Sequence, residues 1–361
     1  MSYSINILPD GLEAHLLETR TVLKKLASAR AALAELKGVA SSIPNERILI
    51  DTLSIQEAKD SSGIENIVTT HDEVYQGVAS ESKFPSPASK EVYRYAEALK
   101  YGFSKIQEQG ILNLKLIKDI QEIIEGNNAG FRRQAGTKLI NDATQEVVYI
   151  PPQKPEVIQT LMSNLEVFIN DAEILEIDPL IKMAIIHHQF ESIHPFYDGN
   201  GRTGRIINIL YLIQQDLLNL PILYLSRYLL KNRSEYYQLL QSTRDTKNWE
   251  EWLIYMLSAV EETSIQTVSQ IKAIKKLMQE LKLRIRKEQP RMYSQDLINN
   301  LFRHPYSKIA LLQSDLHVSR QTARKYLETL SAMGILVKIK IGRSNYFLNH
   351  QLFSLLKNNT T

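Results

Sequence analysis

Apolar residues recur every three or four positions along most of the chain, which is the spacing that places them on one face of an α-helix. The pattern covers residues 12–40 and resumes at residues 45–59. There, Asp60-Ser61-Ser62-Gly63 is predicted either to interrupt the helix or to open a new one with Ser61 or Ser62 as its N-cap. The same spacing predicts helices at residues 92–110, 113–125, 155–170, 177–190 and about 203–262. The fold is therefore predicted to be mainly α-helical.

One segment interrupts the helical pattern. Residues 131–152 hold two short apolar runs, at 138–140 and 147–150, which are separated by Asn141-Asp142-Ala143-Thr144. The second run is closed by Pro151-Pro152. Short apolar runs with a polar turn between them are typical of a β-hairpin, so we expect one at residues 137–152 of an otherwise helical chain.

The C-terminal part of the chain has a mixed pattern. Residues 261–288 predict a connector helix that Pro290 closes. Two helices are expected next, at 308–316 and 320–333, with Ser319 as N-cap of the second. Gly334 would end that helix, and strands are expected at 336–341 and 345–348. This order resembles a winged helix, which is a helix-turn-helix followed by a β-wing.

These patterns divide the chain into four parts. They are an N-terminal helical region (1–110), a core (111–260), the connector helix (261–289) and a winged-helix domain (290–361). The winged-helix resemblance implies an exposed basic face on the second helix and the wing, made by Arg320, Gln321, Arg324, Lys325, Lys338, Lys340 and Arg343. Such a face is suited to DNA. A protein-interaction or dimer module with a solvated basic face is an equal alternative.

Composition narrows the class of protein. The 361 residues are 43% hydrophobic and 23% charged, which is ordinary for a globular protein and sufficient for a sizeable core. A formal net charge of +3 is too small to indicate nucleic acid or an anionic membrane by itself. The absence of cysteine excludes disulfides and thiolate metal sites. With no signal-peptide pattern and no membrane span, we expect a cytoplasmic protein.

The break between the predicted helices at 177–190 and 203–262 carries a chemical pattern. It reads His194-Pro-Phe-Tyr-Asp198-Gly-Asn-Gly-Arg202-Thr-Gly-Arg205. Gly199 and Gly201 allow backbone angles that turn successive amides toward an anion, and the next helix points its N-terminus at the same place. Arg202 and Arg205 lie one turn apart, and each guanidinium matches phosphate oxygens with two hydrogen bonds. The segment predicts a polyphosphate cradle.

Two further side chains suit phosphoryl or nucleotidyl transfer. Asp198, at the edge of the cradle, is a suitable ligand for Mg²⁺ beside phosphates. His194 has an ordinary pKa near neutrality and can take a proton from an incoming hydroxyl. The simpler alternative is a glycine-rich loop with a capping Asp and solvated arginines. It leaves the coincidence of base, carboxylate, nest and two arginines unexplained.

This string resembles the Fic-domain signature H-P-F-x-D-G-N-G-R-x-x-R at every fixed position. The resemblance implies a helical core with a β-hairpin flap and transfer of AMP from Mg-ATP to a Tyr, Thr or Ser of a target protein or of the chain itself. His194 would be the base, Asp198 the Mg²⁺ ligand, and Phe196 the anchor of the loop. The residues implied in ATP binding are Glu65, Asp198, Gly199, Asn200, Gly201, Arg202, Thr203, Gly204, Arg205 and Tyr236.

The resemblance extends to regulation and to the flap. Ser61-Ser62-Gly63-Ile64-Glu65-Asn66 is similar to the family's inhibitory motif [S/T]-x-x-x-E-[G/N], with Ser61 and Glu65 at its key positions. It implies that Glu65 pairs with Arg205 and repels the γ-phosphate, although a surface helix residue is the alternative. The hairpin at 137–152 would clamp the target segment. Tyr236 would contact the nucleoside or, as readily, pack in the core.

Three questions stay open at this level. The chain is expected to be an autoinhibited adenylyltransferase, but a nucleotide-sensing DNA-binding regulator and an enzyme that mainly removes AMP are alternatives. A homodimer is possible from family habit. His187 and His188 occupy consecutive helix positions and face different directions, so we expect them in the core rather than on a metal.

Overall fold

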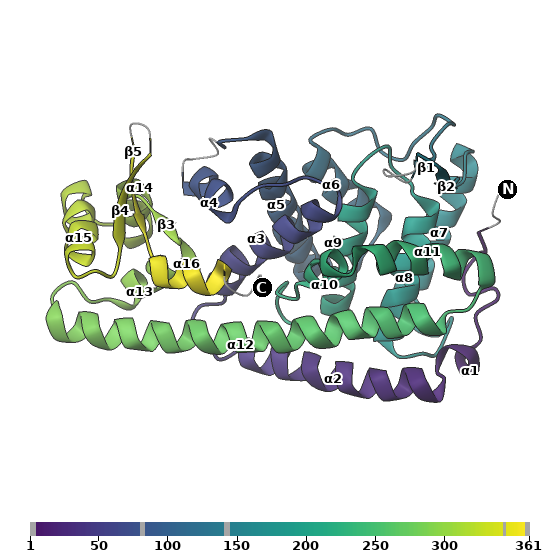
Figure 1. Cartoon of the computed structure of the whole chain (residues 1–361), viewed down its shortest axis with the longest axis horizontal. Coiled ribbons are helices and arrows are strands. Elements are labelled where there is room, and N and C mark those ends of the chain that lie inside the picture. Colours follow the sequence, from purple (N-terminus) through teal and green to yellow (C-terminus); the bar gives the residue numbers. More distant parts are fainter. Residues whose placement is uncertain (1–4, 80–83, 141–144, 342–343, 358–361) are drawn as a thin grey trace.

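The computed structural model describes residues 5–79, 84–140, 145–341 and 344–357. Helices dominate these residues, and the strands form only two small antiparallel sheets, so the prediction of a mainly α-helical fold is confirmed. The long α12 runs along α2, and the C-terminal unit lies at the end of α12 that is far from the hairpin (Figure 1).

The N-terminal region is helical, as predicted. It differs from the prediction at two places: one expected helix is split, and another continues past its expected interruption. Its helices are α1 (Ala14–Leu17), α2 (Arg20–Ala40), α3 (Glu46–Ile64), α4 (His71–Ala79) and α5 (Pro87–Gln109). The helix expected at 12–40 is split because Thr19 caps α2 by accepting a hydrogen bond from Val22 N. The interruption expected at Asp60–Gly63 is wrong, since α3 continues to Ile64.

Burial explains why α3 does not stop at its polar residues. Asp60, Ser61 and Ser62 are all buried against the rest of the fold. Gly63 fits because a Cβ there would lie 3.2 Å from Leu230 Cδ2 on the neighbouring α10. Tertiary packing thus overrides the weak helix propensity of serine and glycine, and it carries the predicted inhibitory segment into the interior.

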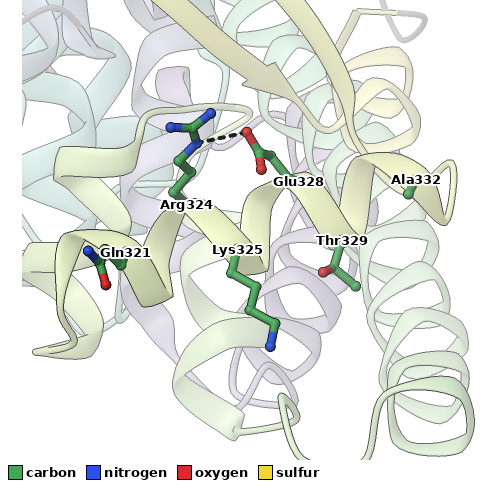
Figure 2. Close-up of a pocket in the computed structure, with 6 residues that line it drawn as sticks. All are labelled: Gln321, Arg324, Lys325, Glu328, Thr329 and Ala332. Atoms are coloured by element: carbon green, nitrogen blue, oxygen red, sulfur yellow. Dashed lines mark hydrogen bonds and ion pairs between the residues drawn. The ribbon is translucent and has the colours of Figure 1, made fainter.

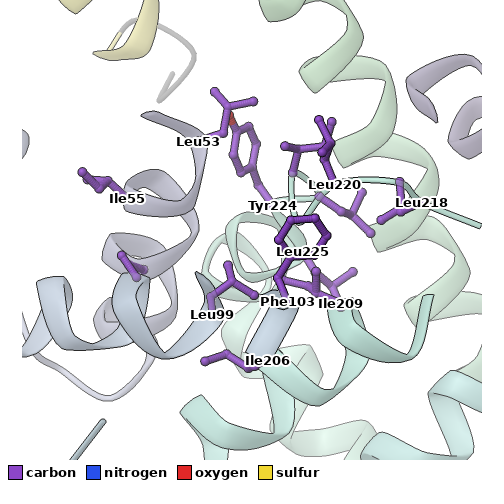
Figure 3. Close-up of a cluster of buried hydrophobic side chains, with 14 of the residues drawn as sticks. Leu53, Ile55, Leu99, Phe103, Ile206, Ile209, Leu218, Leu220, Tyr224 and Leu225 are labelled. Atoms are coloured by element: carbon purple, nitrogen blue, oxygen red, sulfur yellow. The ribbon is translucent and has the colours of Figure 1, made fainter. Parts of the chain in front are cut away.

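The central region is built from α6 (Leu114–Glu125), α7 (Pro155–Asn170), α8 (Pro179–Ile193) and α9 (Asn200–Gln214). Every residue of α8 from Leu180 to Ile193 is buried, so this helix runs through the centre of the core. Figure 3 shows one part of the packing around α9, where Ile206 and Ile209 lie near Leu99 and Phe103 of α5. This rigid frame holds the two ends of the 194–199 loop.

The helical pattern expected from about 203 to 262 is several elements rather than one. After α9 come α10 (Leu225–Lys231), α11 (Arg233–Thr246) and α12 (Glu250–Glu288). The expected connector at 261–289 is therefore the C-terminal part of a helix that begins at Glu250, and the proposed boundary at 260 falls inside it. None of the described helices combines the length and the apolar character needed to cross a bilayer.

The expected hairpin is present. Strands β1 (Leu139–Ile140) and β2 (Val147–Tyr149) pair antiparallel, with Leu139 opposite Tyr149. The turn residues Asn141, Asp142, Ala143 and Thr144 lie outside the described residues.

The C-terminal unit has the predicted order of helices and strands with additions at both ends. It contains α13 (Gln295–Arg303), β3 (Tyr306–Ser307), α14 (Ile309–Leu316), α15 (Arg320–Ala332), β4 (Val337–Ile341), β5 (Ser344–Leu348) and α16 (His350–Lys357). The three strands form a sheet in the order β3-β5-β4. Ser319 caps α15 as expected, and Arg343 lies outside the described residues.

The C-terminal unit is attached to α3, the helix that has Glu65 as its C-cap. Arg303 of α13 pairs with Asp51 of α3 at 3.0 Å. Gln56 of α3 donates a hydrogen bond to the Leu356 carbonyl of α16 at 2.8 Å. The N-terminal helical region and the winged-helix domain therefore share an interface that includes α3, the helix that carries the predicted inhibitory segment.

Candidate active site

The loop between α8 and α9 departs from the expected backbone in one respect. Gly199 has φ +78° and caps α9, so the helix starts at Asn200 rather than near Thr203. Gly201 lies inside the helix and does not need glycine's backbone freedom. It needs the absence of a side chain, because a Cβ there would lie 2.3 Å from Glu65 Oε1.

The loop is held from within by two residues. Phe196 is fully buried and packs against Phe131 and Phe190, with ring centroids 5.3 and 6.4 Å away. The Asn200 side chain accepts from Phe196 N at 2.8 Å and donates to Phe196 O at 2.9 Å. The side-chain amide of Asn200 is thus engaged with the loop backbone and holds the shape of the loop, rather than facing the expected phosphate site.

His194 ends α8 in a left-handed conformation, with φ 49°. Burial, together with the positive charges of Arg132 and Arg244, lowers the pKa of His194 to about 4. The imidazole is therefore neutral at physiological pH and has a nitrogen able to accept a proton.

Arg132 fixes the chain around His194, and sequence reasoning gave it no role. Its Nε donates to the His194 carbonyl at 2.8 Å, and its Nη2 donates to the carbonyls of Ile193 and Pro152. Tyr149 of β2 donates to the Ser192 carbonyl at 2.9 Å. The base of the hairpin and the end of α8 are thereby tied together. A buried arginine that satisfies three carbonyls has no local sequence signal.

Arg205 is held through Nε and Nη2 by the end of α3. Its Nη2 lies 2.8 Å from Glu65 Oε1, its Nε donates to Ser61 Oγ at 2.7 Å, and Nη2 also donates to the Ser61 carbonyl. The Arg205 side chain is 1% exposed and that of Glu65 is 34% exposed. Burial alone would raise the pKa of Glu65, but the contact with Arg205 lowers it below its ordinary value. Glu65 is therefore a carboxylate, placed where the resemblance expected it.

Arg202 is also paired, with carboxylates that the sequence analysis did not mention. Its Nη2 lies 2.7 Å from Glu125 Oε1 of α6, and its Nη1 lies 3.5 Å from Glu91 Oε2 of α5. Asp198 Oδ1 is 3.8 Å from Nη2. Both arginines of the signature thus contact carboxylates from helices outside it.

Asp198 has the exposure that a metal ligand beside a nucleotide needs. Its side chain is 78% exposed, and among the described residues its close donor is Gly199 N, 2.7 Å from Oδ1. Mg²⁺ commonly uses one or two protein carboxylates together with substrate phosphates and water. Among the described residues there is no cluster of three or more His, Cys, Asp or Glu that could form an all-protein metal site.

Two residues expected at the ATP face the protein instead. Thr203 is fully buried in the first turn of α9. Gly204 faces α8, where a Cβ would lie 2.8 Å from Glu191 Oε1 and 3.0 Å from Phe190 Cδ1. The helical repeat explains this placement: positions 202 and 205 point to the paired carboxylates, so 203 and 204 point into the core.

Tyr236 lies in the core rather than at the surface of the site. It is 1% exposed, its ring packs near Trp252, and its hydroxyl lies 2.8 Å from His187 Nε2. The neighbouring Tyr237 is 43% exposed, and Arg233 lies over its ring. Tyr237 is therefore the better candidate for a nucleoside contact, and the core alternative holds for Tyr236.

The two consecutive histidines are core residues, as expected. His187 stacks on Trp252, and burial lowers its pKa to about 3. His188 Nε2 lies 3.2 Å from the Leu240 carbonyl.

A second candidate surface lies on α15. Its exposed face carries Gln321, Arg324, Lys325 and Glu328, which line a shallow depression together with Thr329 and Ala332 (Figure 2). Arg324 Nε pairs with Glu328 Oε1 at 2.9 Å, and Lys338 of β4 lies 3.8 Å from the same oxygen. An acidic residue therefore sits within the basic face that was expected to suit DNA.

Three separate parts of the chain match models of known protein families. Residues 23–104 match the Fic/DOC family N-terminal model, and residues 111–212 match the Fic/DOC family model. Residues 277–352 match the C-terminal domain of SoFic-like protein adenylyltransferases.

Individual relatives are similar over about a quarter of the chain. Protein adenylyltransferase fic-1 of Caenorhabditis elegans is 34% identical over 88 residues, or 24% of this chain and 16% of the relative. A probable protein adenylyltransferase of Aquifex aeolicus is 33% identical over 94 residues, or 26% of each chain. The chain thus spans less than a third of these relatives.

The fold is shared over a longer stretch. A Fic family protein from Desulfovibrio desulfuricans superposes with a TM-score of 0.59 at 20% identity, over 91% of this chain and 96% of that one. A fragment of C. elegans Fic-1 superposes with a TM-score of 0.53 at 20% identity, over 71% and 73% of the two chains. The two Fic/DOC models together cover just over half of the sequence, and on them this chain belongs to the Fic/DOC family.

Proposed function

We propose that the protein transfers AMP from Mg-ATP to a Tyr, Thr or Ser hydroxyl of a target protein or of itself, and that Glu65 restrains this activity. The observation that carries the proposal is the start of α9, where Arg202 lies beside Asp198, Arg205 follows one turn later, and His194 ends the preceding helix. The similar proteins named adenylyltransferases support the reaction class.

The chemistry follows from the side chains present. Neutral His194 takes the proton of the acceptor hydroxyl, whose oxygen attacks the α-phosphorus of ATP. The bond from the α-phosphorus to the oxygen bridging to the β-phosphate breaks, and pyrophosphate leaves. The N-terminal amides of α9, Arg202 and Arg205 would stabilise the negative charge on the phosphates.

Mg²⁺ is the implied cofactor, and Asp198 fits it. This carboxylate is exposed at the mouth of the loop and keeps one oxygen without a close donor. Bound there, the ion would neutralise charge on the triphosphate.

The restraint rests on the ion pair between Glu65 and Arg205. A carboxylate 2.8 Å from Nη2 occupies the fork that the γ-phosphate needs and repels that phosphate. Ser61 adds two hydrogen bonds to the same guanidinium, so α3 blocks most of its donors. Displacing the end of α3 would free Arg205.

The decisive experiment compares Glu65→Gly with the doubly substituted Glu65→Gly, His194→Ala protein. Both are incubated with Mg-ATP and with lysate, and products are identified by intact and peptide mass spectrometry. We expect a gain of one AMP on a hydroxyl side chain with Glu65→Gly and none with the double variant. Equal labelling by both would remove His194 as the base, and no labelling by either would remove the proposed activity.

The remaining assignments extend the proposal beyond the catalytic step. We place the protein in the cytoplasm, and we take the α15 face as a possible DNA contact and a homodimer as a possible assembly. His194→Ala separates the enzyme from a non-enzymatic DNA-binding regulator, because it abolishes AMP transfer and leaves DNA binding unchanged.

A further inference from the structure

The C-terminal end of α6 contacts the loop that precedes α9 and the first turn of α9 itself. Gln121 Nε2 donates to the Asp198 carbonyl at 3.2 Å. One turn later, Glu125 Oε1 lies 2.7 Å from Arg202 Nη2. These contacts join α6 to the two signature residues proposed to handle the metal and the phosphates.

Glu125 is itself fixed in place. Arg94 of α5 donates to its carbonyl at 3.3 Å, and Gly126 ends α6 with φ +70°. A Cβ on Gly199 would lie 2.7 Å from Glu125 Oε1. The glycine at 199 therefore serves two purposes: it adopts a left-handed backbone, and it leaves room for this carboxylate.

The pairing of Arg202 leaves one donor without a partner. Glu125 takes Nη2, and Glu91, whose side chain is 39% exposed, takes Nη1 at 3.5 Å. The buried Nε has no hydrogen-bond partner within the described part of the chain. Two of the three guanidinium nitrogens are thus held by carboxylates, and Glu125, the nearer of the two, has the main part in fixing the Arg202 side chain.

The geometry points to Glu125 as a positioning residue, which holds the Nη2 end of Arg202 so that the guanidinium stays beside Asp198 and meets the β-phosphate of the bound nucleotide. This inference rests on the proposed function, because it takes ATP as the ligand of the α9 cradle. It adds a residue on a helix outside the signature to the nucleotide site.

Glu125 differs from the inhibitory Glu65 in where it lies. Glu65 Oε1 occupies the space beside Gly201, on the helix that offers its amides to phosphate. Glu125 lies beside Gly199, before the helix begins, and its side chain is 14% exposed. Glu65 thus pairs with Arg205 over the first turn of α9, whereas Glu125 pairs with Arg202 beside the loop that precedes the helix.

The test measures nucleotide affinity by calorimetry in the Glu65→Gly protein, so that the restraint does not mask binding. We expect Glu125→Gln in that background to weaken Mg-ADP and Mg-ATP binding about tenfold, since the charge-assisted contact that orients Arg202 becomes a neutral one. AMP lacks the β-phosphate, so its affinity should stay unchanged. Glu122→Gln, an exposed residue one turn earlier on α6, is the matched control and should alter none of the three.

Three outcomes would overturn the inference. If all three nucleotides weaken together, Glu125 only stabilises the fold. If ADP and ATP bind as tightly as before, Arg202 does not depend on Glu125. If they bind more tightly and transfer rises, Glu125 is a second restraint. The nucleotide affinities are independent of AMP transfer, so absence of transfer by Glu65→Gly would remove the proposed reaction without deciding this inference.

Discussion

Two helices of this molecule begin with arginines one turn apart, and they use them in opposite ways. At the start of α9, the Arg202 and Arg205 side chains are 4% and 1% exposed and contact carboxylates from other helices. Near the start of α15, Arg324 is 65% exposed and pairs with Glu328 of its own helix. Buried, long-range pairs are expensive to disturb, whereas an exposed pair within one helix contributes little. The first turn of α9 is thus where substitutions should have large effects.

The largest effect should come from removing Arg205. In the Glu65→Gly protein, Arg205→Ala is expected to lower AMP transfer by about 100-fold, because a buried donor to developing phosphate charge is lost. The measurement is the initial rate at saturating Mg-ATP with a labelled nucleotide. Arg324→Ala, an equally large truncation on α15, should leave that rate unchanged. An equal loss of rate in both variants would show that the buried arginine of α9 matters no more for AMP transfer than the exposed arginine of α15.

Glu65→Gly should be more active and less stable at the same time. Removing the carboxylate leaves a buried guanidinium without its anion, which costs about 3–5 kcal/mol for a fully buried pair. Because Glu65 is about one-third exposed and Ser61 keeps its hydrogen bonds, we expect about 1–2 kcal/mol here. Urea unfolding with and without Mg-ATP measures it, and the nucleotide should restore most of the loss. A variant as stable as the parent would contradict the cost assigned to the unpaired charge.

Substituting Arg132 should have an effect of intermediate size, because Arg132 positions His194 rather than contacting ATP. Arg132→Gln loses the hydrogen bonds to the Ile193, His194 and Pro152 carbonyls, so His194 is no longer held at the end of α8. We expect kcat for AMP transfer to fall about tenfold, a typical share of the benefit of a well-oriented base, with little change in KM for ATP. A rise in KM with unchanged kcat would place Arg132 at the nucleotide rather than behind the base.

The pH dependence of kcat tests whether the burial of the site extends to His194. The pKa of His194 is lowered to about 4, chiefly by burial, from an ordinary value of 6.5. A base with a lowered pKa stays deprotonated as pH falls through 6.5, so kcat of Glu65→Gly should stay level between pH 6 and 8. It should decline only as pH approaches 4. Removing Glu65 also removes a charge that raises the pKa of His194, so the decline cannot move to higher pH for that reason. A decline centred near pH 6.5 would show an exposed imidazole.

The same contrast between local and long-range contacts explains what the sequence could predict. The helix expected at 155–170 is α7 to the residue, because Pro155 starts it and its apolar spacing is regular. The hairpin and the string from His194 to Arg205 were also readable, since their signals lie within a few residues of one another. Contacts local in the chain leave local patterns.

The misses share a cause as well. Glu125 and Arg202 are 77 residues apart, and Arg132 and His194 are 62 apart, so no spacing links them. The continuation of α3 through Ser61 depends on burial against α9 and α10. Tyr236 and Tyr237 are adjacent, and only the packing shows which ring is exposed. Residues that support the signature from other helices had to be found in three dimensions.

The smallest effects belong to α15, where they decide what that face does. Arg324→Ala and Glu328→Ala both break the exposed pair, so neither should change AMP transfer or the unfolding midpoint appreciably. They differ in charge. On duplex DNA, Arg324→Ala should weaken binding and reduce the slope of log affinity against log salt by about 1, whereas Glu328→Ala should strengthen binding. Affinities unaffected by either change would show that the basic side chains on α15 do not meet phosphate, and the face would then be one for protein.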